Sequence, residues 1–321
     1  MRTRFKTCIL AALGAVTVAA PALAQADYPN RVVKIVNPYV AGSTTDLLAR
    51  GLATGLSSRL GQQFIIENKA GAGGAIGTAQ VVRSDPDGYN LLFAPALVLS
   101  VYPQARADTG YTPDSLLPVC QTFTNAMALA VRPDSPIKSI ADLVKAAKEK
   151  PGVLNYGHQG PLTIPHLAME EFLQAAAIDI KDIPFRGEPL VLTDLLGGRL
   201  DVASIVLGSA QGRQDIRVIG IFAETRHPAF PDVPTVKEQG HDVSPASFGG
   251  LLAPAGTPAP ILAKLANACA GAAKDEIYQT TATRAAQPPD YYADAAGFRQ
   301  RLQRDIQNKE RVIKRVTAKP Q

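Results

Sequence analysis

Apolar residues follow two alternating spacings along the chain. Short runs of β-branched and other apolar residues, as at 32–36 and 202–206, are typical of buried strands. Between such runs, apolar residues recur four positions apart, as at Leu48, Leu52 and Leu56, which is typical of a helix packed on one face. The alternation predicts an α/β fold with mostly parallel sheets and helices on both faces.

The same spacings predict the individual elements. Ser139 and Asp142 form a capping pair at one expected helix start. Further strands are expected at 64–68, 90–94, 126–131, 154–156 and 218–222, with an extended segment at 183–185. Further helices are expected at 78–82, 139–148, 167–177, 189–196, from 257 onward, and at 290–316.

The order of these elements predicts two domains. Crossings between them are expected near 122–125 and near 242–249, which assigns 25–123 plus 244–321 to domain 1 and 124–243 to domain 2. In such folds a ligand lies at the carboxyl ends of the strands, often between the domains.

The N-terminus has the pattern of a secretory signal peptide, expected over 1–24. Basic residues within the first six positions precede an uncharged apolar stretch at 8–19 and an Ala-x-Ala cleavage motif at 22–24. Loss of the three basic residues lowers the formal charge from +5 to +2, so nucleic acid is not an expected partner. We expect a soluble, exported mature protein.

Two cysteines, Cys120 and Cys269, remain after cleavage. An oxidising compartment permits a disulfide, but nothing in the sequence brings the two residues together. We therefore expect two small buried apolar residues rather than a bridge.

Residues 38–46 join the first predicted strand to the first predicted helix. The segment is rich in small and hydroxyl residues, and Asp46 lies three positions after Ser43, as in a capping box. A helix N-terminus carries unpaired N–H groups and a partial positive charge. The junction therefore suits an anion such as a carboxylate.

Two later loops are further candidates. Residues 156–167 again join a strand to a helix, with Thr163 as the expected N-cap and His166 in the first turn. This loop is either a second site for an anionic or polar group or an ordinary surface connection. Arg186 either pairs with a ligand carboxylate or is solvated or paired with a glutamate.

The glycine, serine and histidine patterns of the chain do not match known cofactor-binding, catalytic or metal-binding motifs. The glycines at 71–77 match neither a dinucleotide fingerprint nor a P-loop, and we interpret them as a tight turn with close helix packing. There is no Gly-x-Ser-x-Gly motif, and His158 and His166 do not have a metal-ligand spacing. We expect no catalytic residue, no metal and no cofactor.

Ten short motifs in one order resemble the Bug family, the periplasmic solute receptors related to tripartite tricarboxylate transporters. The resemblance covers nearly the whole mature chain behind the signal peptide. The motifs include Pro38-Tyr39-Val40-Ala41-Gly42, Glu67-Asn68-Lys69-Ala70-Gly71, Pro86-Asp87-Gly88-Tyr89, Pro184-Phe185-Arg186-Gly187, Asp194-Leu195-Leu196-Gly197-Gly198 and Pro254-Ala255-Gly256-Thr257-Pro258.

The resemblance implies a two-domain Venus-flytrap receptor of the type II periplasmic binding-protein topology, with a small carboxylate held between the domains. It implies ligand contacts from Tyr39, Ala41, Gly42, Ser43, Thr44 and Asp46 on one wall, with Pro95 and Ala96 nearby, and from Gly157, His158, Gly160, Thr163, Phe185 and Arg186 on the other.

The chain departs from the family pattern at three positions in these loops. Ser43 stands where the family has a second glycine, His158 replaces a serine and Leu162 replaces a glycine. The last two changes enlarge side chains where a ligand is expected. They favour a smaller, more apolar or differently shaped acid over a generic dicarboxylate, or a pocket that has lost its ligand.

We therefore predict a non-enzymatic periplasmic receptor that closes around a small organic acid as a monomer. Its expected membrane partner is a permease or a sensor kinase. The alternatives are a ligand-presenting partner of a two-component system and a secreted hydrolytic enzyme with His158 or His166 as the base.

Overall fold

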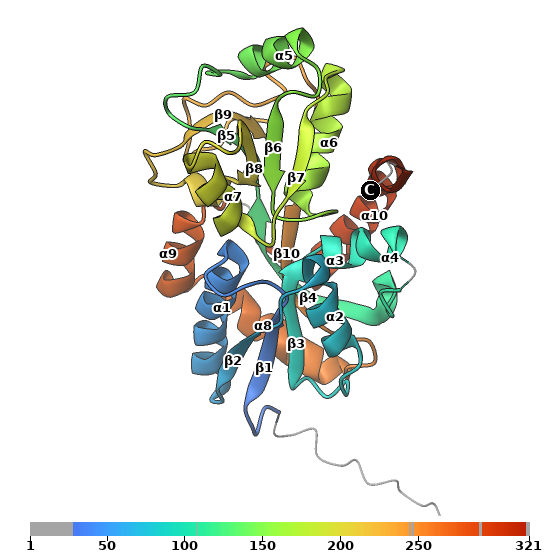
Figure 1. Cartoon of the computed structure of the whole chain (residues 1–321). Helices are drawn as coiled ribbons and strands as arrows, with labels where there is room; N and C mark the ends of the chain where they lie inside the picture. The colour runs from blue at the N-terminus through green and yellow to red at the C-terminus, as the bar shows by residue number, and fades with distance from the viewer. Residues whose placement is uncertain (1–27, 107, 244, 246, 289–290, 319–321) are drawn as a thin grey trace, which may run out of the picture.

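The chain forms two lobes, each built around one β-sheet (Figure 1). The computed structural model describes residues 28–318, except 107, 244, 246 and 289–290. The predicted signal peptide lies outside the described residues. The two-domain α/β fold expected from the alternation of strands and helices is confirmed.

The sheet of the first lobe has the order β11-β4-β10-β3-β1-β2. Strands β1, β2, β3 and β4 run in one direction, while β10 and β11 run against them. The strands are β1 (Val33–Asn37), β2 (Phe64–Asn68), β3 (Asn90–Pro95), β4 (Leu116–Asn125), β10 (Ser247–Pro254) and β11 (Ala293–Asp294).

The sheet of the second lobe has the order β7-β6-β8-β5-β9, and only β5 runs against the other four strands. Both sheets are thus mixed sheets in which most strands run the same way. The strands are β5 (Met127–Val131), β6 (Asn155–His158), β7 (Lys181–Pro184), β8 (Val202–Val206) and β9 (Arg217–Phe222).

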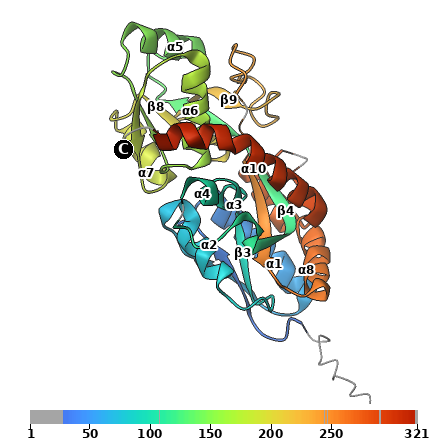
Figure 2. The ribbon, with the colours of Figure 1, turned by 90° about the vertical axis from the view of Figure 1, so that its right-hand side faces the viewer.

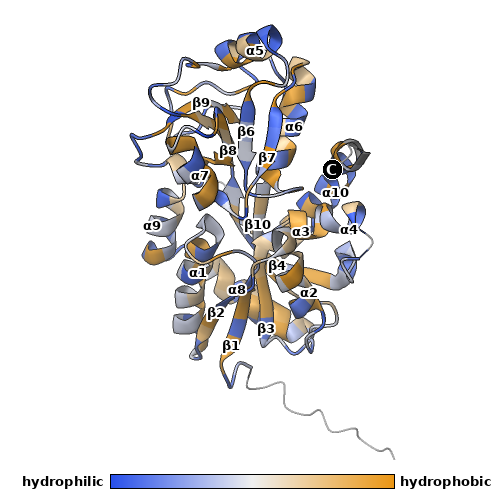
Figure 3. Ribbon diagram, viewed as in Figure 1, coloured by the Kyte–Doolittle hydropathy of each residue, from blue (hydrophilic) through white to orange (hydrophobic). Residues whose placement is uncertain are grey.

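Helices cover both sheets, and many of the strands in Figure 3 carry the colours of hydrophobic residues. The buried apolar side chains form the core between the sheets and the helices packed on them. None of the helices in the described part of the chain is long and apolar enough to cross a membrane. The α-helices are α1 (Thr44–Leu60), α2 (Ala75–Val82), α3 (Leu97–Ser100), α4 (Tyr102–Ala105), α5 (Ile140–Glu149), α6 (Ile164–Ala176), α7 (Glu188–Leu196), α8 (Ala259–Ala272), α9 (Glu276–Arg284) and α10 (Ala295–Ala318). Short 3-10 turns are η1 (Ala72–Gly74), η2 (Pro113–Ser115) and η3 (Leu207–Ala210).

Local sequence signals explain several of these helices. Leu48, Leu52 and Leu56 are fully buried on the inner face of α1, as their spacing predicts. Ser139 caps α5 by accepting a hydrogen bond from the Asp142 N–H at 3.1 Å.

The chain passes from the first sheet to the second at Ala126, between β4 and β5, and is back in the first sheet at Ser247. Strands β4 and β10 pair along most of their length and carry these passages side by side. Ala126 directly follows the predicted segment 122–125, and Ser247 lies within the predicted segment 242–249. The assignment of the whole chain to two domains by these bounds stays a prediction.

Helix α10 contacts both lobes (Figure 2). On the first lobe, the Ser100 hydroxyl donates to the Asp305 carboxylate at 2.6 Å. On the second, Lys309 Nζ lies 3.8 Å from the Glu171 carboxylate of α6. Helix α10 therefore belongs to the first lobe and also connects it to the second lobe through side-chain contacts.

Cys120 and Cys269 form a disulfide, so the expectation of two unpaired thiols is wrong. Cys120 lies on β4 and Cys269 on α8, and both are fully buried. The fold packs α8 against β4, a contact between residues 149 positions apart that spacing along the chain does not reveal.

Candidate functional site

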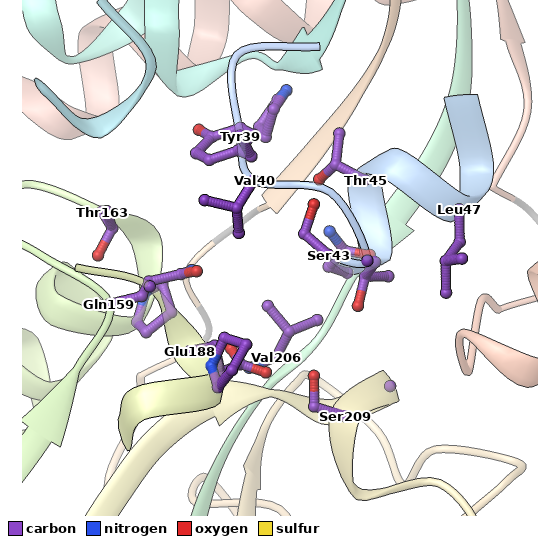
Figure 4. A pocket seen from close by; sticks show the side chains of 18 of the residues that line it. Tyr39, Val40, Ser43, Thr45, Leu47, Gln159, Thr163, Glu188, Val206 and Ser209 are labelled. Atoms are coloured by element: carbon purple, nitrogen blue, oxygen red, sulfur yellow. The ribbon is translucent and has the colours of Figure 1, made fainter. Parts of the chain in front are cut away.

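A cavity of about 1290 Å³ lies between the two lobes. The segments that follow β1, β2 and β3 line it from the first lobe, and those that follow β6, β7 and β8 line it from the second. The carboxyl ends of parallel strands thus meet at one space, the usual position of a ligand in open α/β sheets. In Figure 4, Tyr39 and Ser43 face Gln159, Glu188 and Ser209 across this cavity.

The first wall is the β1–α1 junction. Ser43 is the N-cap of α1 and its hydroxyl accepts the Asp46 N–H at 3.3 Å, as the capping pattern predicts. Thr44 and Thr45 line the cavity in the first turn, where backbone N–H groups have no partner within the helix. An anion can therefore approach these donors from the cavity.

Asp46 stabilises the β1–α1 loop from the side that faces away from the cavity. Its carboxylate accepts hydrogen bonds from the Gly42 N–H at 2.9 Å, from Asn68 Nδ2 at 2.9 Å and from Arg50 Nε at 3.0 Å. Burial raises the pKa of this carboxyl, but the three donors outweigh burial and lower the pKa below its ordinary value. The ionised side chain fixes the loop and does not line the cavity.

The second wall is the β6–α6 junction. Thr163 is the N-cap of α6, as predicted, but its hydroxyl donates to the Gly160 carbonyl at 2.7 Å instead of capping the helix. The first turn of α6 therefore has no side-chain cap, and Ile164 in that turn lines the cavity. The loop therefore lines the cavity and is not a separate surface connection.

The glycine-rich segment after β2 packs as closely as expected. A Cβ on Gly77 would lie 2.8 Å from the Lys69 carbonyl oxygen, and Gly73 and Gly74 have positive φ. The sequence did not indicate that residues 70–74 also line the cavity.

Among the described residues, the charged side chains that line the cavity are those of Arg50, Arg186, Arg213, Arg284 and Glu188. Arg50 is paired with Asp46, and Arg213 is paired with Asp215. Within the described residues, neither Arg186 nor Arg284 has an acidic partner within 4.0 Å. Two positive charges in the cavity are thus available to a ligand.

Glu188 is the acidic residue of the cavity, at the start of α7 and 9 % exposed. Desolvation by burial raises the pKa of its carboxyl to about 7, although the Ser209 hydroxyl and the Val206 N–H, at 3.0 Å, both favour the ionised form. This residue was not predicted. Its only signal in the sequence is its position two residues after Arg186.

The predicted ligand residues divide into two groups. The predicted ligand residues that do not line the cavity are Ala41, Asp46, Ala96, Gly157 and His158. Leu162 does not line it either. The expected intrusion of the larger His158 and Leu162 side chains into the ligand space is therefore not found. The predicted residues that line the cavity are Tyr39, Gly42, Ser43, Thr44, Pro95, Gly160, Thr163, Phe185 and Arg186.

Sequence spacing also gave no sign of Arg284, Thr281 and Ile277, which reach the cavity from α9. Helix α9 lies late in the chain, and only the packing of α9 against α1 brings it to the first wall.

His158, His166 and Asp182 lie together behind the second wall. The ring nitrogens and the carboxylate oxygen that could bind a metal ion lie within 4.8 Å of one another. Their arrangement does not suit a metal ion. The two imidazoles are stacked, with an angle of 17° between their planes and centroids 4.4 Å apart. A metal lies in the plane of each imidazole that binds it, and one ion cannot lie in two stacked planes.

The fold and the cavity define a two-domain solute-binding protein. A family model described as "tripartite tricarboxylate transporter family receptor" matches residues 48–318. A UPF0065 protein of Bordetella pertussis is 35 % identical over 245 residues, which is 75 % of this chain and 76 % of that protein. The chain belongs to the tripartite tricarboxylate transporter receptor family, as the resemblance to the Bug family implied.

Solved structures of the family superpose over most of the chain. The periplasmic binding protein BugD is 27 % identical, with a TM-score of 0.83 over 92 % of this chain and 100 % of that one. A Rhodopseudomonas palustris protein solved with adipate is 27 % identical, with a TM-score of 0.83 over 90 % and 98 %. MatC from Rhodopseudomonas palustris with bound malate is 28 % identical, with a TM-score of 0.81 over 89 % and 100 %.

Proposed function

We propose that this protein is a periplasmic receptor that captures a small organic carboxylate in the cavity between its lobes. The observation that carries the proposal is that the starts of helices α1 and α6 and Arg186 meet at one cavity. Arg186 has no acidic partner in the part of the chain that the structure describes. Helix starts and arginine are both suited to carboxylate oxygens. Two solved relatives, one with adipate and one with bound malate, support this class of ligand.

The proposal extends to delivery of the ligand to a tripartite tricarboxylate-type transporter, supported by the family to which the chain belongs. The similarity to BugD, a periplasmic binding protein, and the signal-peptide pattern support a periplasmic location. The alternative membrane partner is a sensor kinase. Affinity capture from membranes with ligand-loaded protein distinguishes a permease from a kinase.

The position of the candidate bases supports a non-enzymatic role. The imidazoles of His158 and His166 do not line the cavity, and their Nε2 atoms face Asp182. A ligand in the cavity is therefore not within reach of either ring. Turnover of an ester or amide that disappears in a His166→Ala variant with an intact fold would contradict this role.

The experiment that tests the proposal is a thermal-shift screen followed by calorimetric titration. The panel contains aliphatic mono- and dicarboxylates, including adipate and malate, and aromatic acids. We expect at least one acid to raise the unfolding temperature and to bind with a micromolar or lower dissociation constant. Absence of binding across the whole panel would contradict the proposal and leave a degraded pocket as the better description.

Replacement of Arg186 by methionine should weaken binding of the best acid about 10- to 100-fold, because a charge-assisted hydrogen bond to a carboxylate is lost. Calorimetric titration gives the dissociation constants. Arg213→Met is the matched control, because Arg213 also lines the cavity but is held by Asp215 at 2.7 Å. Equal effects of the two substitutions would show that Arg186 contributes only to the general positive charge.

Binding of an acid should also weaken as the pH rises from 6 to 8. The Glu188 carboxyl has its pKa raised to about 7 by burial and lines the cavity, so it loses its proton in this range and then repels an anionic ligand. We expect a loss of up to about tenfold in affinity, measured by titration at each pH. The Glu188→Gln variant should show a smaller loss, and an equal slope in both proteins would exclude Glu188 as the cause.

A further inference from the structure

Two stacked imidazoles lie directly behind the loop that forms the second wall. His158 ends β6, and His166 lies in the first turn of α6. Both rings are buried, and their Nε2 atoms lie 2.6 Å and 3.5 Å from the two carboxylate oxygens of Asp182 on β7. The proposed function does not use this cluster.

The other nitrogen of each ring faces the main chain of the loop. The Leu162 N–H donates to His166 Nδ1 at 3.0 Å. His158 Nδ1 lies 2.9 Å from the Gly160 carbonyl oxygen and 3.2 Å from the Gly160 nitrogen. A backbone N–H can only donate, so His166 Nδ1 must be an acceptor. The ring proton of neutral His166 is then on Nε2, which faces Asp182.

The carboxylate of Asp182 supports this arrangement. Although burial raises the pKa of Asp182, hydrogen bonds from His158 and His166 outweigh burial and lower it well below the ordinary value. The carboxylate is therefore ionised and remains an acceptor for the Nε2–H group, which favours the tautomer of His166 that accepts from Leu162.

Leu162 needs such support because of its backbone conformation. Its φ is +62°, in the left-handed region that side chains other than glycine rarely adopt. Its side chain is 5 % exposed and packs in the hydrophobic core. The neighbours of Leu162 in the chain, Gly160, Pro161 and Thr163, line the cavity.

We propose that His166, held in one tautomer by Asp182, is a positioning residue for the ligand. It accepts the Leu162 N–H, keeps that residue in the left-handed conformation and so presents the main chain of residues 159–163 to the cavity. Because leucine, unlike glycine, is strained at positive φ, the loop depends on this hydrogen bond. The proposal rests on the proposed function, since it concerns the same cavity.

A matched pair of substitutions separates the two nitrogens of His166. In His166→Asn the amide oxygen can take the place of Nδ1 and accept from Leu162, whereas in His166→Gln the amide group lies near the place of Nε2. We expect His166→Gln to weaken binding of the best acid about tenfold, the effect of one lost hydrogen bond. We expect His166→Asn to remain within about threefold of the wild type.

A second substitution tests the role of the leucine conformation. Glycine adopts positive φ without strain, so Leu162→Gly in the His166→Gln background should restore most of the lost affinity. The same substitution removes a buried side chain and should lower the unfolding temperature. Affinity and stability therefore move in opposite directions, which a merely structural role of His166 does not predict.

Hydrogen exchange of the peptide that contains Leu162 gives a readout that needs no ligand. The Leu162 amide should exchange faster in His166→Gln than in the wild type and His166→Asn. Equal exchange and equal affinity in the two variants would overturn the positioning role. If no acid binds the wild type but the exchange difference appears, the proposed function fails while the link between His166 and Leu162 stands.

Discussion

Removal of the Cys120–Cys269 disulfide should lower the free energy of unfolding by roughly 2–5 kcal/mol. The bond joins β4 to α8 across 149 positions, so it closes a loop that contains the whole second lobe. A cross-link over so long a loop removes much of the conformational freedom of the unfolded chain, which places the expected loss toward the upper end of the range.

Denaturant unfolding of the wild type and of the Cys120→Ala/Cys269→Ala double variant measures this effect. Both cysteines are fully buried in the core of the first lobe, so part of the loss comes from packing. The wild type unfolded in the presence of a reductant is therefore the control, since it loses the bond and keeps both side chains. A difference below about 1 kcal/mol between the oxidised and reduced wild type would contradict the prediction.

Replacement of Glu188 by glutamine should stabilise the protein above neutral pH by on the order of 2 kcal/mol. Burial raises the pKa of this carboxyl from 4.5 to about 7 in the folded protein. Between these values the folded state holds a proton that the unfolded state releases. The wild type therefore loses stability as the pH rises from about 4.5 to about 7.

Glutamine keeps an oxygen that can accept the Val206 N–H and does not titrate, so its variant should lack this loss. The measurement is the free energy of unfolding of both proteins at pH 5 and pH 8. All other titrating groups are common to the two proteins and cancel in the difference. Glu310→Gln, at an exposed glutamate bonded to Lys314, is the control, and a gap of the same size there would contradict the assignment to Glu188.

Local patterns were enough to predict most of the fold. The strand at 202–206 has the predicted bounds, and the Ser139 cap and the buried face of α1 follow from spacing alone. These features depend on residues close in the chain. The long antiparallel pair of β4 and β10 was not predicted, because its pairing depends on residues more than a hundred positions apart.

The candidate site was predictable to a smaller extent. Ser43, Thr163 and Arg186 belong to loops that follow strands, and the rule that ligands lie at strand ends brings them to one cavity. The contribution of α9, the buried carboxyl of Glu188 and the meeting of His166 with Asp182 all depend on tertiary packing. No local sequence pattern around Leu162 indicates its positive φ, because leucine rarely adopts this conformation and the hydrogen bond to His166 exists only in the folded loop.

The measurement that tests the central claim most directly is a calorimetric titration with the best acid of the screen and with its uncharged amide. The amide keeps the shape of the ligand and removes its negative charge, which the helix starts of α1 and α6 and the Arg186 guanidinium are proposed to bind. We expect the acid to bind at least about 100-fold more tightly than the amide. Equal affinities for the two, or binding of the acid that is unchanged in Arg186→Met, would contradict a carboxylate receptor.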